Sequence, residues 1–185
     1  MNLLPIDELN RIELDLKTAE ITGEKKPVEE ILDDVLDFLL FVYFTGSQDA
    51  AEALGIQAEP SIEDARKALN LKVAGKTYKE RIREYSEGVS EDGESPTDEI
   101  IRVIDTDMTR IYNTAVLDTG IANGATRKTW QTMEDERVRD PHRILQGVTV
   151  PIDGEFYTDG DHAPQPGMFT KAALNVNCRC YLTVS

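Results

Sequence analysis

The feature that most constrains the fold is a change of sequence pattern near Gly124. Before it, apolar residues recur at the three- and four-residue spacing of amphipathic helices. After it, short apolar runs are separated by glycine, proline and polar residues, which is typical of short strands and turns. The sequence therefore predicts an α+β chain: an N-terminal helical region followed by a small C-terminal module with a short antiparallel sheet and one short helix.

Three segments follow from this pattern. We expect a helical region over residues 1–90, a connecting long helix within residues 91–125, and the α+β module over residues 126–185. The helices are expected at residues 7–22, 27–44, 61–88 and 96–122. Ser61, in a capping box with Asp64, and Ser95 are the expected N-caps, Gly75 is expected to kink the third helix, and the last helix is expected to end near Gly120 or Gly124. The wide apolar stripe of residues 28–44 is either buried against other helices or forms a groove for a partner.

The module is expected to hold four short strands. They are "TRKTWQTM", "VTVPID", "EFYT" and "CRCYLTV", with the helix "PHRILQ" capped by Asp140 and ended by Gly147, and with "DGDHAPQPGMF" as a polar loop. We expect the strand around Trp130 to pair antiparallel with the strand Cys178–Val184, and His142 to pack over both.

Charge is unevenly distributed along the chain. Residues 1–125 hold 13 basic and 27 acidic side chains, a net charge of −14, whereas residues 126–185 hold 7 basic and 8 acidic ones. This excess of acid argues against sequence-specific binding of nucleic acid, because phosphates are bound by clustered Lys and Arg. An acidic surface either keeps a protein soluble or meets a basic partner.

The N-terminal sequence and the hydropathy pattern indicate a soluble intracellular protein. The start lacks a basic segment followed by an apolar run, so no signal peptide is expected. The most apolar stretch, "VLDFLLFVYFTG", is too short to span a bilayer and contains Asp37, so no membrane segment is expected.

The two cysteines, Cys178 and Cys180, leave three alternatives. A disulfide between residues two apart would be strained, and a reducing compartment disfavours it. A zinc site could use some of His142, His162, Cys178 and Cys180, although the Cys-x-Cys spacer is tighter than usual. The favoured alternative is that both are free, buried side chains acting as small hydrophobes, with no cofactor.

Two clusters of charged residues are further candidates for a site. Asp135, Arg137, Arg139 and His142 lie within eight residues, and could form an acid/base site or, as we favour, a buried or half-buried polar network with Arg179. In the long helix, Asp107, Arg110 and Asn113 share one face. They either reach the C-terminal module or form a solvated face with one ion pair.

Four segments together resemble a known family. "KTYKERI", "DTDMTRIYN", "GATRKTWQTMEDERVRDPHRILQGVTVPIDGEFYTDGDHAPQPGMF" and "NVNCRCYL" resemble the head-morphogenesis, or minor head, proteins of tailed bacteriophages, and more narrowly the Mu F-like family. The resemblance runs from about Thr77 to Leu182. Its motif positions fall on Lys128, Trp130, Asp135, Arg137, Arg139, His142, Asn177, Cys178, Arg179 and Cys180. One position departs from the family, because Asp107 stands after Thr106 where a longer Glu is typical.

The resemblance implies a structural, low-copy virion protein. It would act with the phage portal and capsid proteins in head assembly and in DNA packaging or delivery, as an oligomeric or virion-associated component found in the host cytoplasm during assembly. Related modules also occur fused to toxin domains, so two alternatives remain open: a metal-stabilised, zinc-dependent module of hydrolase type, and an acidic helical interaction module. The resemblance supplies no catalytic residue.

Overall fold

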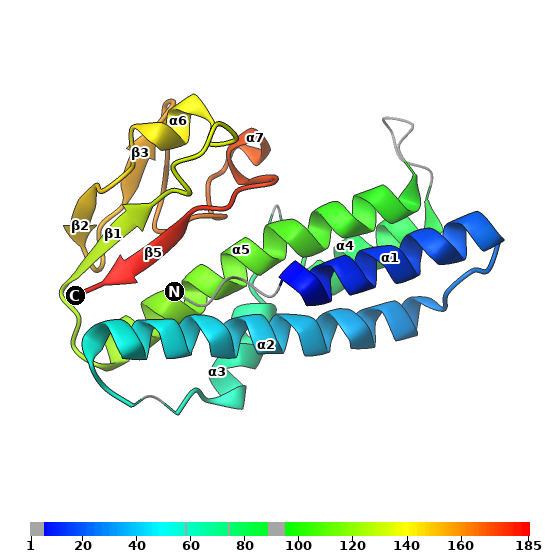
Figure 1. The fold of residues 1–185 in the computed structure, drawn as a ribbon, viewed down its shortest axis with the longest axis horizontal. Helices are drawn as coiled ribbons and strands as arrows, with labels where there is room; N and C mark the ends of the chain where they lie inside the picture. The colour runs from blue at the N-terminus through cyan, green and yellow to red at the C-terminus, as the bar shows by residue number, and fades with distance from the viewer. Residues whose placement is uncertain (1–5, 58, 74, 89–94) are drawn as a thin grey trace.

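The fold is a layer of helices with a small mixed module packed against one end of it, as the computed structural model shows (Figure 1). The structure describes residues 6–57, 59–73, 75–88 and 95–185. Five helices form the N-terminal layer: α1 (Ile6–Thr22), α2 (Val28–Leu54), α3 (Ile62–Leu69), α4 (Tyr78–Glu87) and α5 (Pro96–Ala122). The acidic loop that the sequence suggests around residues 89–94 lies outside the described residues.

Helices α2 and α5 lie side by side and form the centre of the helical layer (Figure 1). Their apolar stripes bury Val35, Leu39, Ile104 and Ile111 completely. The stripe of α2 is therefore part of the core, as the first of the two alternatives expected. Ser95 caps α5 by accepting a hydrogen bond from the backbone N–H of Asp98, as predicted.

Helix α2 does not end near Phe44, and that prediction was wrong. It continues through Gly46 as one helix to Leu54 and ends at Gly55, whose φ of 67° forms a left-handed C-cap. Helix α5 packs so closely on α2 at Gly46 that only glycine fits there. A Cβ at this position would lie 2.5 Å from the carbonyl oxygen of Tyr112 on α5. Tertiary packing, which a local pattern does not contain, overrides the usual helix-breaking tendency of glycine.

Gly46→Ala is expected to destabilise the protein by about 1–2 kcal/mol, because the overlap with the α5 backbone outweighs the gain in helix propensity. Urea unfolding followed by circular dichroism measures the difference. Glu52→Ala, an exposed change on the same helix, should stay within about 0.5 kcal/mol of the parent chain. A Gly46→Ala variant more stable than the parent would contradict the close packing of α2 on α5.

The single helix predicted over residues 61–88 is two helices. Helix α3 ends at Leu69, and a tight turn closed by two hydrogen bonds between the backbones of Val73 and Lys76 separates it from α4. Gly75 lies in this turn and has a φ of 81°, a left-handed conformation that glycine adopts readily. Ser61 caps α3 as predicted, but the reciprocal capping box forms at Thr77 and Glu80, at the start of α4.

The C-terminal module contains two small antiparallel sheets. Its elements are β1 (Arg127–Gln131), α6 (Asp140–Arg143), β2 (Thr149–Pro151), β3 (Phe156–Thr158), β4 (Asp161–Ala163), α7 (Ala172–Asn175) and β5 (Tyr181–Val184). One sheet has the order β2-β1-β5 and the other pairs β3 with β4. The pairing of Trp130 opposite Leu182 confirms the predicted antiparallel partnership of the first and last strands.

Three local predictions for the module were wrong. The polar loop contains β4 itself. The cysteines precede β5 instead of lying on it, and α6 is preceded by Arg139 as its N-cap, where Asp140 was expected.

Candidate functional site

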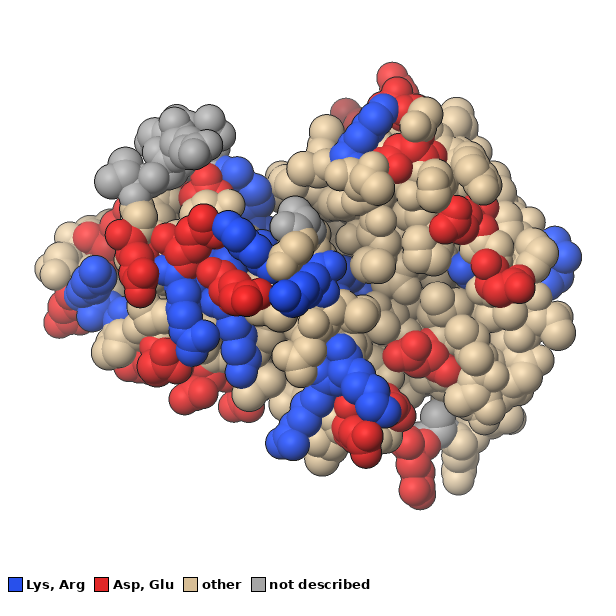
Figure 2. Space-filling model, turned by 180° about the vertical axis from the view of Figure 1, so that it is seen from behind, with Lys and Arg blue, Asp and Glu red and all other residues tan. Residues whose placement is uncertain are grey.

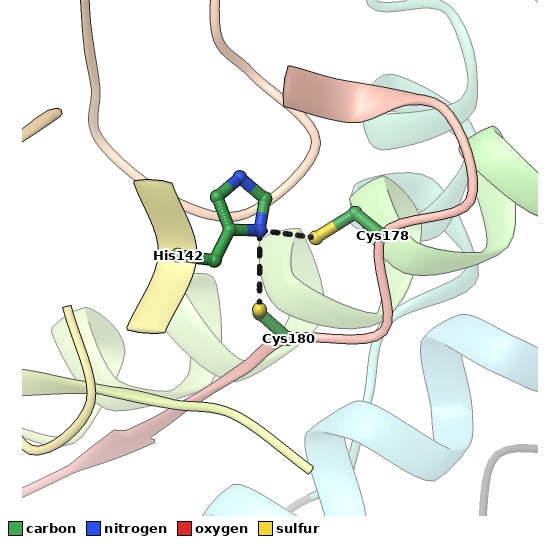
Figure 3. Close-up of side chains that lie close together, drawn as sticks. All are labelled: His142, Cys178 and Cys180. Atoms are coloured by element: carbon green, nitrogen blue, oxygen red, sulfur yellow. Dashed lines mark hydrogen bonds between the residues drawn. The ribbon is translucent and has the colours of Figure 1, made fainter. Parts of the chain in front are cut away.

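Three side chains of the module converge in its interior: His142 from α6, and Cys178 and Cys180 from the segment that leads into β5 (Figure 3). The Nδ1 atom of His142 lies 3.6 Å from the Sγ of Cys178 and 3.4 Å from the Sγ of Cys180. All three residues are buried, and both cysteines are free thiols. The disulfide alternative therefore does not apply in this structure.

The local sequence explains this convergence. Pro141 sits in the first turn of α6, where a missing N–H costs nothing, and it fixes the turn that presents His142. Asn177 adopts a φ of 54°, a left-handed conformation that turns the chain just before Cys178. The antiparallel pairing of β1 and β5 then sets Trp130 beneath the cluster, with its ring 5.5 Å from that of His142.

The two thiols are electrostatically unequal. A hydrogen bond from the Cys180 thiol, together with the nearby His142 ring, lowers the pKa of Cys178 well below its usual value. The same contact with Cys178, and burial, raise the pKa of Cys180.

Helix α5 holds the backbone on both sides of these thiols. The hydroxyl of Thr109 donates to the carbonyl of Cys178 at 2.5 Å, and the side-chain amide of Asn113 donates to the carbonyl of Cys180 at 3.1 Å. Asn113 also accepts a hydrogen bond from the backbone N–H of Leu182 at 2.7 Å. Of the two alternatives for this face of α5, the one in which Asn113 reaches the C-terminal module is confirmed.

Asp107 and Arg110 instead form a buried ionic group inside the helical layer. Asp107 accepts from the Nε of Arg110 at 2.9 Å and from a guanidinium N–H of Arg81 on α4 at 2.5 Å. The side chains of Asp107 and Arg110 are both 0% exposed, so the alternative of a solvated face is wrong. The short side chain of Asp107 thus reaches both arginines.

The charged residues around α6 do not form one network. Asp135 pairs with Arg179 at 2.8 Å, as the clustering of residue types suggested, and this contact lowers the pKa of Asp135. Arg139 instead donates to the carbonyls of Ala173 and Val176 around α7. Arg137 has an exposed side chain. Asp135 is therefore joined to Arg179 and, through a backbone N–H, to Arg137, as predicted, whereas Arg139 makes separate contacts around α7.

Two further candidates lie apart from the thiols. His162, on β4, is half exposed and pairs through Nδ1 with Glu155 at 2.5 Å, so the structure does not bring it into the cluster. Lys128 is buried on β1, with its Nζ 5.8 Å from the centre of the Phe156 ring. Burial lowers the pKa of Lys128. Asn177 contributes its left-handed turn and lies beside the cluster.

Two residues that organise the module, Asp161 and Asn175, were not predicted from the sequence. Asp161 accepts from the backbone N–H groups of His162 and Lys171 and from the hydroxyl of Thr170, and these bonds lower its pKa. Asn175 exchanges two hydrogen bonds with the backbone of Phe169. An Asp or Asn in a Gly- and Pro-rich loop is a general signal for such backbone contacts, although it does not give the partner.

The comparison with protein families gives a decisive match. The family described as Phage Mu protein F like protein matches residues 66–183, which is most of the chain. This chain belongs to the Phage Mu protein F like family. Membership relates it to the phage head, and the matched region includes α4, α5 and every residue of the thiol cluster.

One curated relative shares a shorter segment with this Mu F-like chain. The NAD(+)–arginine ADP-ribosyltransferase EFV of Enterococcus faecalis is 41% identical over 54 residues, which is 29% of this chain and 11% of that protein. The chain thus spans about a tenth of the length of that relative. No solved structure gives a significant match to the chain. In the part of the chain that the structure describes, no helix is long and apolar enough to cross a membrane.

Proposed function

We propose that this Mu F-like chain is a low-copy minor head protein of a tailed phage. It would act with the portal and capsid proteins in head assembly and in DNA packaging or delivery, as an oligomeric or virion-associated component. The family match over residues 66–183 is the observation that carries the proposal. Because a fold alone does not specify a function, the geometry of the site has to support the proposal independently.

The geometry of the site supports an architectural role for the family motif. The cavity beside His142, Cys178 and Cys180 has a volume of about 10 Å³, close to the space of one water molecule. A peptide or phosphodiester substrate needs a pocket of roughly 300 Å³ or more. The hydrogen bonds of Thr109 and Asn113 instead join this motif to α5, so the module and the helices brace one another.

The transferase activity named for the Enterococcus relative is not part of the proposal. The shared segment is 54 residues long and makes up 11% of that protein. A segment of that size is consistent with a module that is used in different larger proteins. Our proposal therefore concerns the role of the module in the phage head.

The distribution of charged side chains on the surface limits the kind of partner that could dock there. On the part of the face in Figure 2 that α3 and α4 cover, Lys and Arg side chains are interspersed with Asp and Glu. Several pair with each other, for example Lys67 with Asp64 and Arg83 with Glu29. A partner of this face would therefore meet both signs of charge, which does not favour a purely acidic interaction module there.

The experiment is co-expression of the untagged chain with a tagged portal protein of the same phage, followed by isolation of the portal ring. We expect the chain to co-purify in a few copies per ring, and to occur in purified virions far below the major capsid protein by quantitative mass spectrometry. Repeating the isolation at rising salt separates the alternatives, because an interaction through charge alone weakens steeply. Absence from both ring and virion would refute the proposal.

A further inference from the structure

Hydrogen bonding does not explain how the side chains of His142, Cys178 and Cys180 are arranged. A ring nitrogen carries either one proton or one lone pair, so it makes one good hydrogen bond. Here two sulfur atoms approach the same nitrogen, His142 Nδ1, at 3.4 and 3.6 Å. A shared cation placed among the three atoms would use the lone pair and both sulfurs at once.

The distances match those of a tetrahedral metal site. Zinc binds a cysteine sulfur at about 2.3 Å and a histidine nitrogen at about 2.0–2.1 Å, which at a tetrahedral angle places sulfur and nitrogen about 3.5 Å apart. The three donor atoms of this cluster all lie within 4.8 Å of one another. Figure 3 shows both sulfurs and the ring nitrogen pointing toward a common centre.

The surroundings fit a bound ion in three respects. The donors are buried, with 1% of His142, 2% of Cys178 and 4% of Cys180 exposed, so water competes weakly for the ion. Thr109 and Asn113 donate hydrogen bonds to the backbone carbonyls of Cys178 and Cys180, which holds the two thiols in place. Two thiolates also neutralise the charge of a divalent cation, so burial of the assembled site is less costly.

The small cavity supplies a fourth position. It is lined by the three donor residues and by Met133, Arg137, Val138, Arg139, Asn177 and Arg179. Its volume of about 10 Å³ is roughly that of one water molecule. No carboxylate among the described residues lines it, so this part of the chain offers three ligands and the fourth would be water.

We propose that His142 Nδ1, Cys178 Sγ and Cys180 Sγ bind one zinc ion, with water in the fourth position, and that the ion fastens α6 to the segment before β5. The soft thiolates select zinc over magnesium or calcium, which prefer oxygen ligands. On binding, both thiols release their protons and the imidazole stays neutral. This inference goes beyond the proposed head function and holds or fails independently of it.

The test uses the full chain without a histidine tag, purified under reducing conditions. Elemental analysis should find about one zinc per chain, and replacement with Co²⁺ should give the intense near-ultraviolet absorption of a cobalt–thiolate bond. Chelation should lower the Tm by about 5–10 °C, because an ion that binds only the folded state stabilises it. Readdition of Zn²⁺ should restore the Tm.

Cys178→Ser and Cys180→Ser should each lose most of the zinc, whereas the control His162→Ala should keep it, since His162 lies outside the cluster. Circular dichroism shows whether each variant is folded. If a serine variant fails to fold, thiol titration of the parent chain decides: zinc should slow the reaction of both thiols, and chelation should speed it. Folded parent protein with neither zinc uptake nor a cobalt–thiolate band would overturn the proposal, as would equal zinc loss in His162→Ala.

Discussion

Asp107→Asn is expected to lower the free energy of unfolding by about 3–5 kcal/mol. The carboxylate of Asp107 is the partner of two guanidinium groups, those of Arg81 and Arg110. Arg110 is 0% exposed, so the neutral amide would leave a buried positive charge without its counter-charge. Removing one member of a buried ion pair costs far more than the net stabilisation that the pair provides.

Chemical unfolding followed by circular dichroism measures this effect. Glu8→Gln is the matched control, because it removes the same charge from an exposed ion pair with Arg11 at 2.5 Å. Solvent screens that pair, so the control should change stability by no more than about 0.5–1 kcal/mol. Equal losses in the two variants would show that Asp107 and its arginines are not buried together.

The helical layer was largely predictable because its apolar stripes are long and regular. Residues 7–22 and the Ser95-capped helix follow from periodicity and capping alone. One error arose where a distant contact decided the structure, because Gly46 lies in the middle of α2 and packs on Tyr112 of α5. The other error is local, because α3 already ends at Leu69 and Gly75 lies in the turn before α4 with a φ of 81°.

The sequence predicted which residues belong to the site better than it predicted how they are arranged. The concentration of thiols, imidazole and guanidinium groups in residues 126–185 pointed to the right part of the chain, and His142 does pack beside Cys178 and Cys180. The sequence did not show that Asn113 on α5 would hold the last strand. Nor did it separate His162 from the cluster, since which loop residues meet depends on the pairing of β3 with β4.

Trp130→Ala is expected to lower the free energy of unfolding by about 3–5 kcal/mol, the range for removing a large side chain from a core. Trp130 is 0% exposed. Its ring packs within 5.2 Å of Phe156, 5.5 Å of His142 and 5.7 Å of Phe169, measured between ring centres. It therefore fills the space between the two sheets and α6, and alanine would leave a cavity directly under the thiol cluster.

The same substitution should also make both thiols more accessible, because Trp130 supports the ring of His142 from below. Urea unfolding by circular dichroism gives the stability, since the only tryptophan is lost, and titration with a thiol reagent gives the reactivity. Two control variants are measured alongside. Trp130→Phe keeps an aromatic ring and should lower the free energy of unfolding less than Trp130→Ala does. Tyr157→Ala changes an aromatic residue of the same module that is 68% exposed, and should lower the free energy of unfolding by under about 0.5 kcal/mol. If Trp130→Ala has the same free energy of unfolding as Tyr157→Ala and its thiols react no faster than those of the parent chain, the two sheets and α6 do not share a core around Trp130.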